Sequence, residues 1–233
     1  MYYETNELYH YGVPGMRWGH RKASKLQNRA KNARESAAEW DEMARLAKAK
    51  GKINKANKYK QNANEDRADA AKYQQKAEKK VGKKFARAGM KIGRADYEKE
   101  LGDAAYKKHA DKAKVLDKIA KKSEAEGKFA KAEMARSSAA KLRARGENVR
   151  AGHYEAADRY LKRGEKLNKK ASEFSASTNV NLGKKKVDSI IKSSRQKGYE
   201  KSRQEAEFQK EERIRSRFGD DGVDAYRFAK GTY

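Results

Sequence analysis

The sequence predicts an all-α protein made of elongated helical hairpins that pack as an antiparallel, coiled-coil-like bundle. Three observations predict this class. The 233 residues include 37 alanines and are rich in Lys, Glu, Gln and Arg, which favour helices, and they include a single proline. Ala56, Ala63, Ala70 and Ala77 recur every seven residues, which is the spacing of helices packed side by side. Because alanine buries little apolar area, we expect narrow helical seams and no large globular core.

Changes in composition along the chain divide it into six segments. We expect an aromatic and Gly-rich docking motif at 1–22, a basic helical hairpin at 23–80, a Gly-rich hinge at 81–103, further basic helical hairpins at 104–174, a linker with a short docking segment at 175–199, and a charge-balanced helix with an aromatic tail at 200–233.

Glycines are expected to mark the joints between the helices. Gly51, Gly127 and Gly152 each precede a basic residue or His, and a large apolar residue follows at the start of a helical stripe. Since Gly readily adopts the left-handed conformation that ends a helix, we expect a helix to end at each of them, and the large residue to anchor the next helix. The four glycines within 81–103 each weaken a helix, so they predict flexible breaks there.

The most specific motif in the chain lies at 9–21. Pro14-Gly15 suits the central positions of a type II turn, and the apolar side chains around it can form a small knot. Such a knot is too small to be stable alone, so we expect it to dock on the protein's own helices or on a partner. A flexible, sticky N-terminus is the alternative. The partner-docking residues are Tyr9, His10, Tyr11, Gly12, Val13, Pro14, Gly15, Met16, Arg17, Trp18, Gly19 and Arg21.

This motif resembles a short N-terminal signature, His-x-Gly-[Val/Ile]-x-Gly-Met-[Lys/Arg]-Trp-Gly-x-Arg, found in minor structural and head-associated proteins of tailed bacteriophages and prophages, mainly from Gram-positive hosts. The match runs from His10 to Arg21 and covers about a dozen residues. The resemblance implies a role in the virion or in its assembly. It implies no biochemical mechanism, because the signature has no activity of its own.

The charge of the chain points to an anionic partner. The 59 Lys and Arg residues face 33 Asp and Glu residues, giving a formal net charge of +26, and all of that excess lies in residues 1–199. Nucleic acid is the commonest such partner, and Lys-rich helices contact its phosphates without reading sequence. A solvated lysine face with no dedicated ligand is the alternative. The candidate nucleic-acid-binding residues are Arg21, Lys22, Lys48, Lys50, Lys52, Lys79, Lys80, Lys83, Lys84, Lys121, Lys122, Arg143, Arg145, Lys184, Lys185 and Lys186.

Motifs for catalysis, metals and membranes are missing from the sequence. There is no cysteine, and His10, His20, His109 and His153 are not at metal-ligand spacing, so we expect no metal, no cofactor and no enzymatic activity. No apolar run reaches the roughly 20 residues of a membrane span, and no signal peptide is readable.

These observations favour a non-enzymatic, virion-associated minor head or internal structural protein of a bacteriophage. It would reside in the phage head, and in the host cytoplasm during assembly. The basic helices would bind nucleic acid nonspecifically, and the N-terminal motif would dock on a capsid or portal protein; self-association is a further expectation. Two alternatives stay open: a scaffold or assembly protein that binds capsid or portal, and a cargo protein ejected into the host cell.

Overall fold

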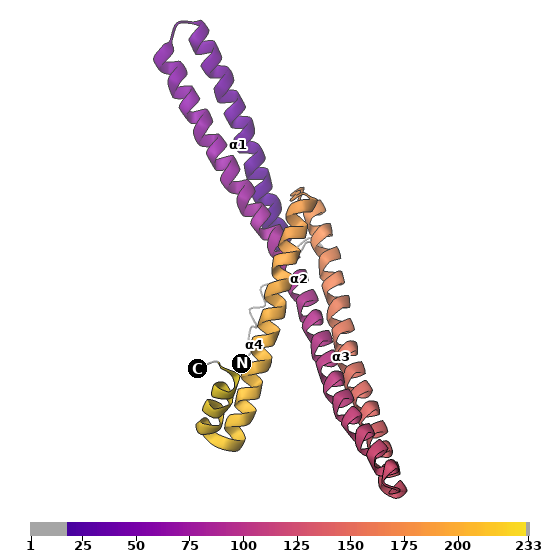
Figure 1. Cartoon of the computed structure of the whole chain (residues 1–233). Helices are drawn as coiled ribbons and strands as arrows, with labels where there is room; N and C mark the ends of the chain where they lie inside the picture. The colour runs from indigo at the N-terminus through magenta and orange to yellow at the C-terminus, as the bar shows by residue number, and fades with distance from the viewer. Residues whose placement is uncertain (1–17, 232–233) are drawn as a thin grey trace, which may run out of the picture. The chain divides into compact units, whose positions relative to one another are not determined.

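The computed structural model describes residues 18–231, with side chains from Lys22 onward, and these residues form four long helices and no strand. In chain order the helices are α1 (Trp18–Ala49), α2 (Ile53–Ala125), α3 (Phe129–Ser177) and α4 (Lys184–Lys230) (Figure 1). The predicted all-α class is confirmed. The chain divides into two compact units: unit 1 is Met1–Lys84 with Lys169–Lys186, and unit 2 is Phe85–Asn168 with Val187–Tyr233.

The ends of α1 and α2 share one capping geometry. Gly51 and Gly127 take positive φ values of 69° and 73°. The residue after each glycine donates its backbone N–H to a carbonyl five residues earlier, at 2.9 Å for Lys52 to Ala47 and 2.8 Å for Lys128 to Ser123. This is the Schellman motif, in which glycine avoids the steric penalty of a left-handed residue. The helix ends predicted at Gly51 and Gly127 are therefore confirmed.

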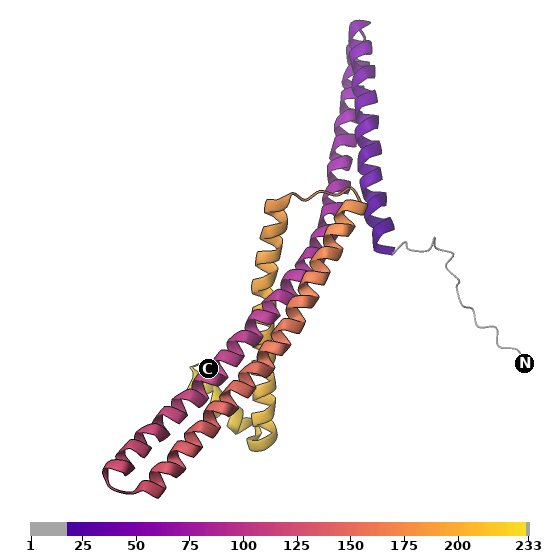
Figure 2. The same ribbon diagram turned by 90° about the vertical axis from the view of Figure 1, so that its right-hand side faces the viewer.

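In unit 1, α1 packs antiparallel against the first part of α2, and the two lie side by side in both views (Figures 1 and 2). The seam consists of small side chains because alanines recur every seven residues on both helices. Contacts at its edges fix the pairing: Trp40 stacks on Tyr59 at 5.6 Å between ring centroids, and Ser36 donates a hydrogen bond of 2.6 Å to Asp66. The buried seam residues are Ala23, Ala30, Ala37 and Ala44 of α1, and Ala56, Ala63, Ala70 and Ala77 of α2.

The end of α3 supplies the largest buried side chain of unit 1. Phe174 is 1% exposed, and Thr178, in the connection to α4, is 2% exposed and donates a hydrogen bond of 2.7 Å to the Phe174 carbonyl. Val180 and Leu182 of the same connection are buried as well. The connection between α3 and α4 is therefore short and packed against unit 1.

In unit 2, α2 and α3 pair through a seam of small residues in which two glycines face two histidines. A Cβ on Gly102 of α2 would lie 3.0 Å from the Cβ of His153 of α3. The same relation recurs in reverse, because a Cβ on Gly146 of α3 would lie 2.9 Å from the Cβ of His109 of α2. The Cβ of each histidine thus lies where a side chain on the opposite helix is missing.

Also in unit 2, α4 packs against α2 at close range through small residues. Gly89 of α2 faces Ser194 of α4, Gly93 of α2 faces the backbone of Arg195, and Gly198 of α4 faces the backbone of Met90. A Cβ on Gly89 would lie 2.6 Å from the carbonyl oxygen of Ile191, so the two backbones are in direct contact. Beyond this crossing, α4 kinks at Gly219 (φ 70°, ψ −168°) and its last residues fold back.

Ion pairs and hydrogen bonds hold the folded-back end of α4. Arg227 binds Glu211 through two hydrogen bonds of 3.1 and 2.7 Å, and Tyr226 donates one of 2.9 Å to Glu207. Val223 lies beneath them at 2% exposure. The charge-balanced segment thus pairs its charges within unit 2.

The structure corrects the prediction of a glycine hinge. Residues 81–103 lie inside the continuous helix α2, so the breaks predicted there are wrong in secondary structure. The cost of Gly in a helix is about 1 kcal/mol per residue. Close packing of Gly89, Gly93 and Gly102 against other helices offsets this cost.

Three smaller predictions are also corrected. Gly152 lies inside α3, exposed and surrounded by helix-forming residues, and it ends no helix. Ile53 and Phe129 do not anchor their helices, because they are 64% and 70% exposed and the seam begins three residues later in each helix. Within the segment predicted at 175–199, a non-helical linker does occur, at 178–183, but the short docking segment is part of one long helix, because α4 begins at Lys184 and runs on without a break beyond residue 200.

Candidate nucleic-acid interface

Two runs of lysines that are far apart in the sequence meet in unit 1. An ion pair of 2.6 Å between Lys186 Nζ at the start of α4 and Glu78 on α2 brings them together. Beneath them, Lys84 Nζ lies 4.1 Å from the ring centroid of Phe174, so that a buried aromatic supports one of the ammonium groups. We call this group the lysine cluster: Lys79, Lys80, Lys83 and Lys84 of α2 with Lys184, Lys185 and Lys186 of α4.

The electrostatics around the lysine cluster strongly favour an anion. The hydrogen bond that Glu78 accepts from Lys186 lowers the pKa of Glu78 below its ordinary value, although burial of the carboxyl acts in the opposite direction. The first turn of α4 contains no acidic residue, although the N-terminus of a helix is its positive end. Lys184 and Lys185 are exposed there. Unit 1 as a whole holds 26 basic residues against 11 acidic ones.

The other predicted nucleic-acid-binding residues are spread over both units. Lys48, Lys50 and Lys52 are exposed around the turn between α1 and α2, and Lys22 is exposed near the start of α1. Lys121 and Lys122 of α2 and Arg145 of α3 are exposed in unit 2. Arg143 forms an ion pair with Asp117, so its charge is partly neutralised.

The N-terminal docking motif falls mostly outside the described residues. This applies to Tyr9 through Arg17, and so to the type II turn and the apolar knot predicted there. Trp18, Gly19 and Arg21 lie in the first turns of α1, where only the backbone is described.

Several cation–aromatic contacts could not be seen in the sequence. In unit 2, Arg94 and Lys91 of α2 lie 4.7 and 5.6 Å from the ring centroid of Tyr160 of α3. With Arg87 they occupy positions i, i+4 and i+7 of one helical face. This spacing is visible in the sequence and indicates a basic helical face, but the three residues form no run of adjacent lysines of the kind from which the nucleic-acid-binding residues were predicted.

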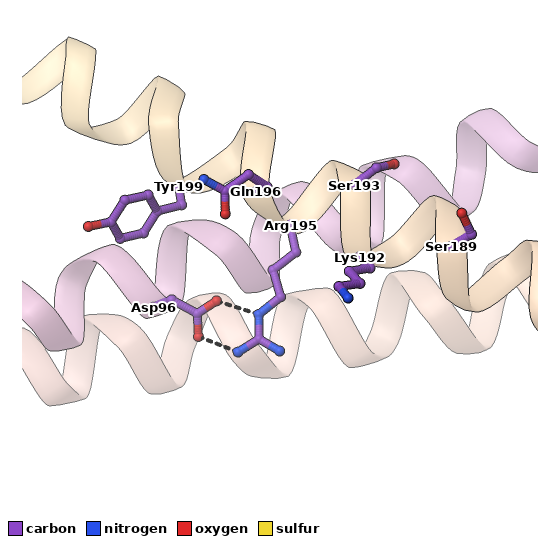
Figure 3. A pocket seen from close by; sticks show the side chains of 7 residues that line it. All are labelled: Asp96, Ser189, Lys192, Ser193, Arg195, Gln196 and Tyr199. Atoms are coloured by element: carbon purple, nitrogen blue, oxygen red, sulfur yellow. Dashed lines mark hydrogen bonds and ion pairs between the residues drawn. The ribbon is translucent and has the colours of Figure 1, made fainter.

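A second charged area of unit 2 is already paired within the protein. Asp96 of α2 accepts two hydrogen bonds from Arg195 of α4, at 2.5 and 2.8 Å, at the edge of an open groove (Figure 3). Tyr199, which also lines this groove, donates to Glu100. Arg195 and Tyr199 on this side of α4 are therefore already bonded to carboxylates of α2.

Residues 18–231 hold no group of three or more His, Asp or Glu side chains placed to bind a metal ion. None of the helices in this range combines the length and the apolar character that crossing a membrane requires.

A family of unknown function, DUF7211, matches residues 4–25, which include the N-terminal motif. No curated protein and no solved structure matches the chain. The matched segment is about a tenth of the sequence, and the helices lie almost entirely outside it.

Proposed function

We propose that this protein is a non-enzymatic, virion-associated structural protein of a bacteriophage that binds nucleic acid nonspecifically through its basic helices. The observation that carries the proposal is the lysine cluster, in which the ion pair between Lys186 of α4 and Glu78 of α2 brings the three lysines at the start of α4 to the segment of α2 that holds the other four. An exposed group of this charge binds phosphates and releases their counterions. Because contacts from lysines to phosphates carry no sequence information, we expect this binding to be independent of sequence.

The N-terminal motif supports the second half of the proposal. Its resemblance to phage head-associated proteins supports a location in or near a capsid, where packaged DNA would provide the anion. Residues 1–22 would dock on a capsid or portal protein, and the remaining helices would stay available to DNA. Removing residues 1–22 should abolish co-sedimentation with capsids, whereas DNA binding should persist. If the removal abolished DNA binding as well, this division of roles would be wrong.

Titration of the full chain with duplex DNA tests the binding proposal. We expect two duplexes of unrelated sequence to bind with equal affinity. The affinity should fall steeply with salt, so that log Kd rises with log[salt] by a slope of about 0.9 for each phosphate contacted. The triple variant K83Q/K184Q/K185Q removes three lysines of the cluster and keeps the ion pair between Lys186 and Glu78.

The matched control is K25Q/K58Q/K60Q, which removes three exposed lysines of unit 1 outside the cluster. The cluster variant should reduce the salt slope of log Kd by the equivalent of about two to three phosphate contacts, and the control variant should reduce it by distinctly less. Equal losses in both variants would show a general charge effect without a defined interface. Absence of DNA binding at low salt would contradict the proposal.

A further inference from the structure

A small groove in unit 2 is lined by positive side chains from two helices. It encloses about 270 Å³ between α2, α3 and α4. Arg87, Lys91 and Arg94 line it from α2, and Lys201 and Glu205 line it from α4. We propose that this basic groove binds one phosphate of a DNA backbone, an inference that rests on the function proposed above.

Direct backbone contact fixes the two walls of the basic groove. A Cβ on Gly198 of α4 would lie 2.3 Å from the carbonyl oxygen of Met90 on α2. One turn further along α4, Ser202 is buried and donates a hydrogen bond of 3.0 Å to the Gly198 carbonyl. The cations on the two helices are therefore held at a fixed separation, so the binding site exists before the ligand arrives.

The basic groove has more positive charge than its own carboxylate can neutralise. Glu205 lies 3.9 Å from both Arg94 and Lys201, close to the outer limit for an ion pair. Lys186 and Glu78, by comparison, approach to 2.6 Å. Among the described residues, Glu205 is the one carboxylate that lines the groove, against four cations, and only Arg94 and Lys201 of these lie within ion-pair distance of it, so the groove has an excess of positive charge.

Arg94 presents a buried donor without an acceptor. Its Nε atom is buried and has no hydrogen-bond partner among the described residues. Its guanidinium group lies over the Tyr160 ring, with Cζ 4.7 Å from the ring centroid. A buried donor is costly to leave unpaired. A phosphate oxygen in the groove would accept from Arg94, which is the geometry that arginine favours with phosphate.

The size of the groove favours a phosphate group over a whole nucleotide. Pockets that enclose drug-sized molecules occupy about 300–1,000 Å³, and this groove is slightly smaller. The backbone of a duplex can insert a phosphate while its sugars and bases stay outside. An acidic segment of a protein is the competing occupant, and the test below separates the two.

The test compares two charge-matched double variants of the full chain. R87Q/K91Q removes two cations of the groove and keeps Arg94 with its contact to Tyr160. K107Q/K108Q removes two exposed lysines elsewhere on α2 in the same unit. Circular dichroism verifies that both variants remain helical. Each variant is titrated with a 20-base-pair duplex over a range of salt, and with a poly-glutamate peptide.

We expect R87Q/K91Q to reduce the salt slope for the duplex by about one to two phosphate contacts, and K107Q/K108Q to leave it nearly unchanged. The charge-preserving variant R87K/K91R should restore the slope. In the wild type, titration with the duplex should shift the NMR signal of the Arg94 Nε–H group.

Other outcomes overturn the inference. Equal slopes in the two double variants, with DNA binding retained, would reject the groove and leave the proposed function intact. Absence of DNA binding by the wild type would reject both. A selective loss of poly-glutamate binding by R87Q/K91Q, with DNA binding unchanged, would assign the groove to an acidic protein partner and reject the DNA phosphate.

Discussion

A Cβ on Gly93 of α2 would lie 1.8 Å from the carbonyl oxygen of Arg195 on α4. No side-chain rotation can relieve this contact, because the obstructing atoms, which belong to Arg195 and Tyr199, are part of the α4 backbone. Gly93 is therefore required for α4 to pack on α2 as it does.

The substitution Gly93→Ala should destabilise unit 2 by about 3 kcal/mol, the upper end of the usual cost of overpacking. Urea unfolding followed by circular dichroism measures this. Gly152→Ala is the matched control, since Gly152 is helical and has no atom within 4 Å of the added Cβ. The control should stabilise the protein by up to about 1 kcal/mol. Similar effects of the two variants would mean that α4 does not pack closely on α2.

The alanine seam of unit 1 should not tolerate a larger residue. Ala63 is 0% exposed, and leucine at this position would push α1 and α2 apart. Ala63→Leu should cost about 1–3 kcal/mol and shift the fluorescence of Trp40, which stacks on Tyr59 near this point. Ala38→Leu, at an exposed position of α1, should change neither quantity. An unchanged stability for Ala63→Leu would contradict the close approach of the two helices.

Phe174 should contribute more to the stability of unit 1 than any alanine of the seam. It is 1% exposed, and Phe174→Ala would leave a large cavity, costing about 3–5 kcal/mol. Phe208→Ala changes a phenylalanine that is 64% exposed, and its effect should stay within about 0.5 kcal/mol. Thermal unfolding of the two variants compares them, and a small effect of Phe174→Ala would show that the end of α3 is not docked.

The ion pair between Glu78 and Lys186 should make the stability of unit 1 depend on pH. The hydrogen bond from Lys186 lowers the pKa of Glu78 below its ordinary value of 4.5, so the folded chain favours the carboxylate. The stabilisation is complete above pH 4.5 and is lost as the pH falls through the lower pKa of the folded state.

The difference in unfolding free energy between wild type and Glu78→Gln, measured from pH 7 to pH 3, should therefore shrink in acid. Lys186→Gln should remove most of this dependence, because it removes the largest cause of the lowered pKa. A difference that stays constant with pH would show that the pair does not form.

Local chemistry made part of this fold predictable. Helix-forming residues and the seven-residue alanine repeat indicated long helices, and the Gly51 and Gly127 sequences indicated two of their ends. Helix propensity and glycine capping depend on residues only a few positions apart in the sequence. Long-range contacts were not predictable in this way, and they explain why Gly93, which breaks an isolated helix, lies in the middle of α2.

The candidate sites were likewise predictable only where they depend on residues close together in the sequence. The lysine cluster consists of two runs visible in the sequence, but their meeting through Lys186 and Glu78 joins residues 108 positions apart. The basic groove was missed because Arg87 and Lys201 stand in no run of charge, and only the packing of α4 on α2 brings them together.

The exchange of glycine and histidine between α2 and α3 prevents the two helices from slipping past each other. Alanines that recur every seven residues pack almost equally well after one helix shifts by seven residues along the other. A shift in one direction would set Gly102 against Gly146 and open a void; the other would force His109 onto His153. Of these three registers, only the observed one sets each histidine opposite a glycine, so these four residues disfavour mispaired alternatives that alanine alone would accept.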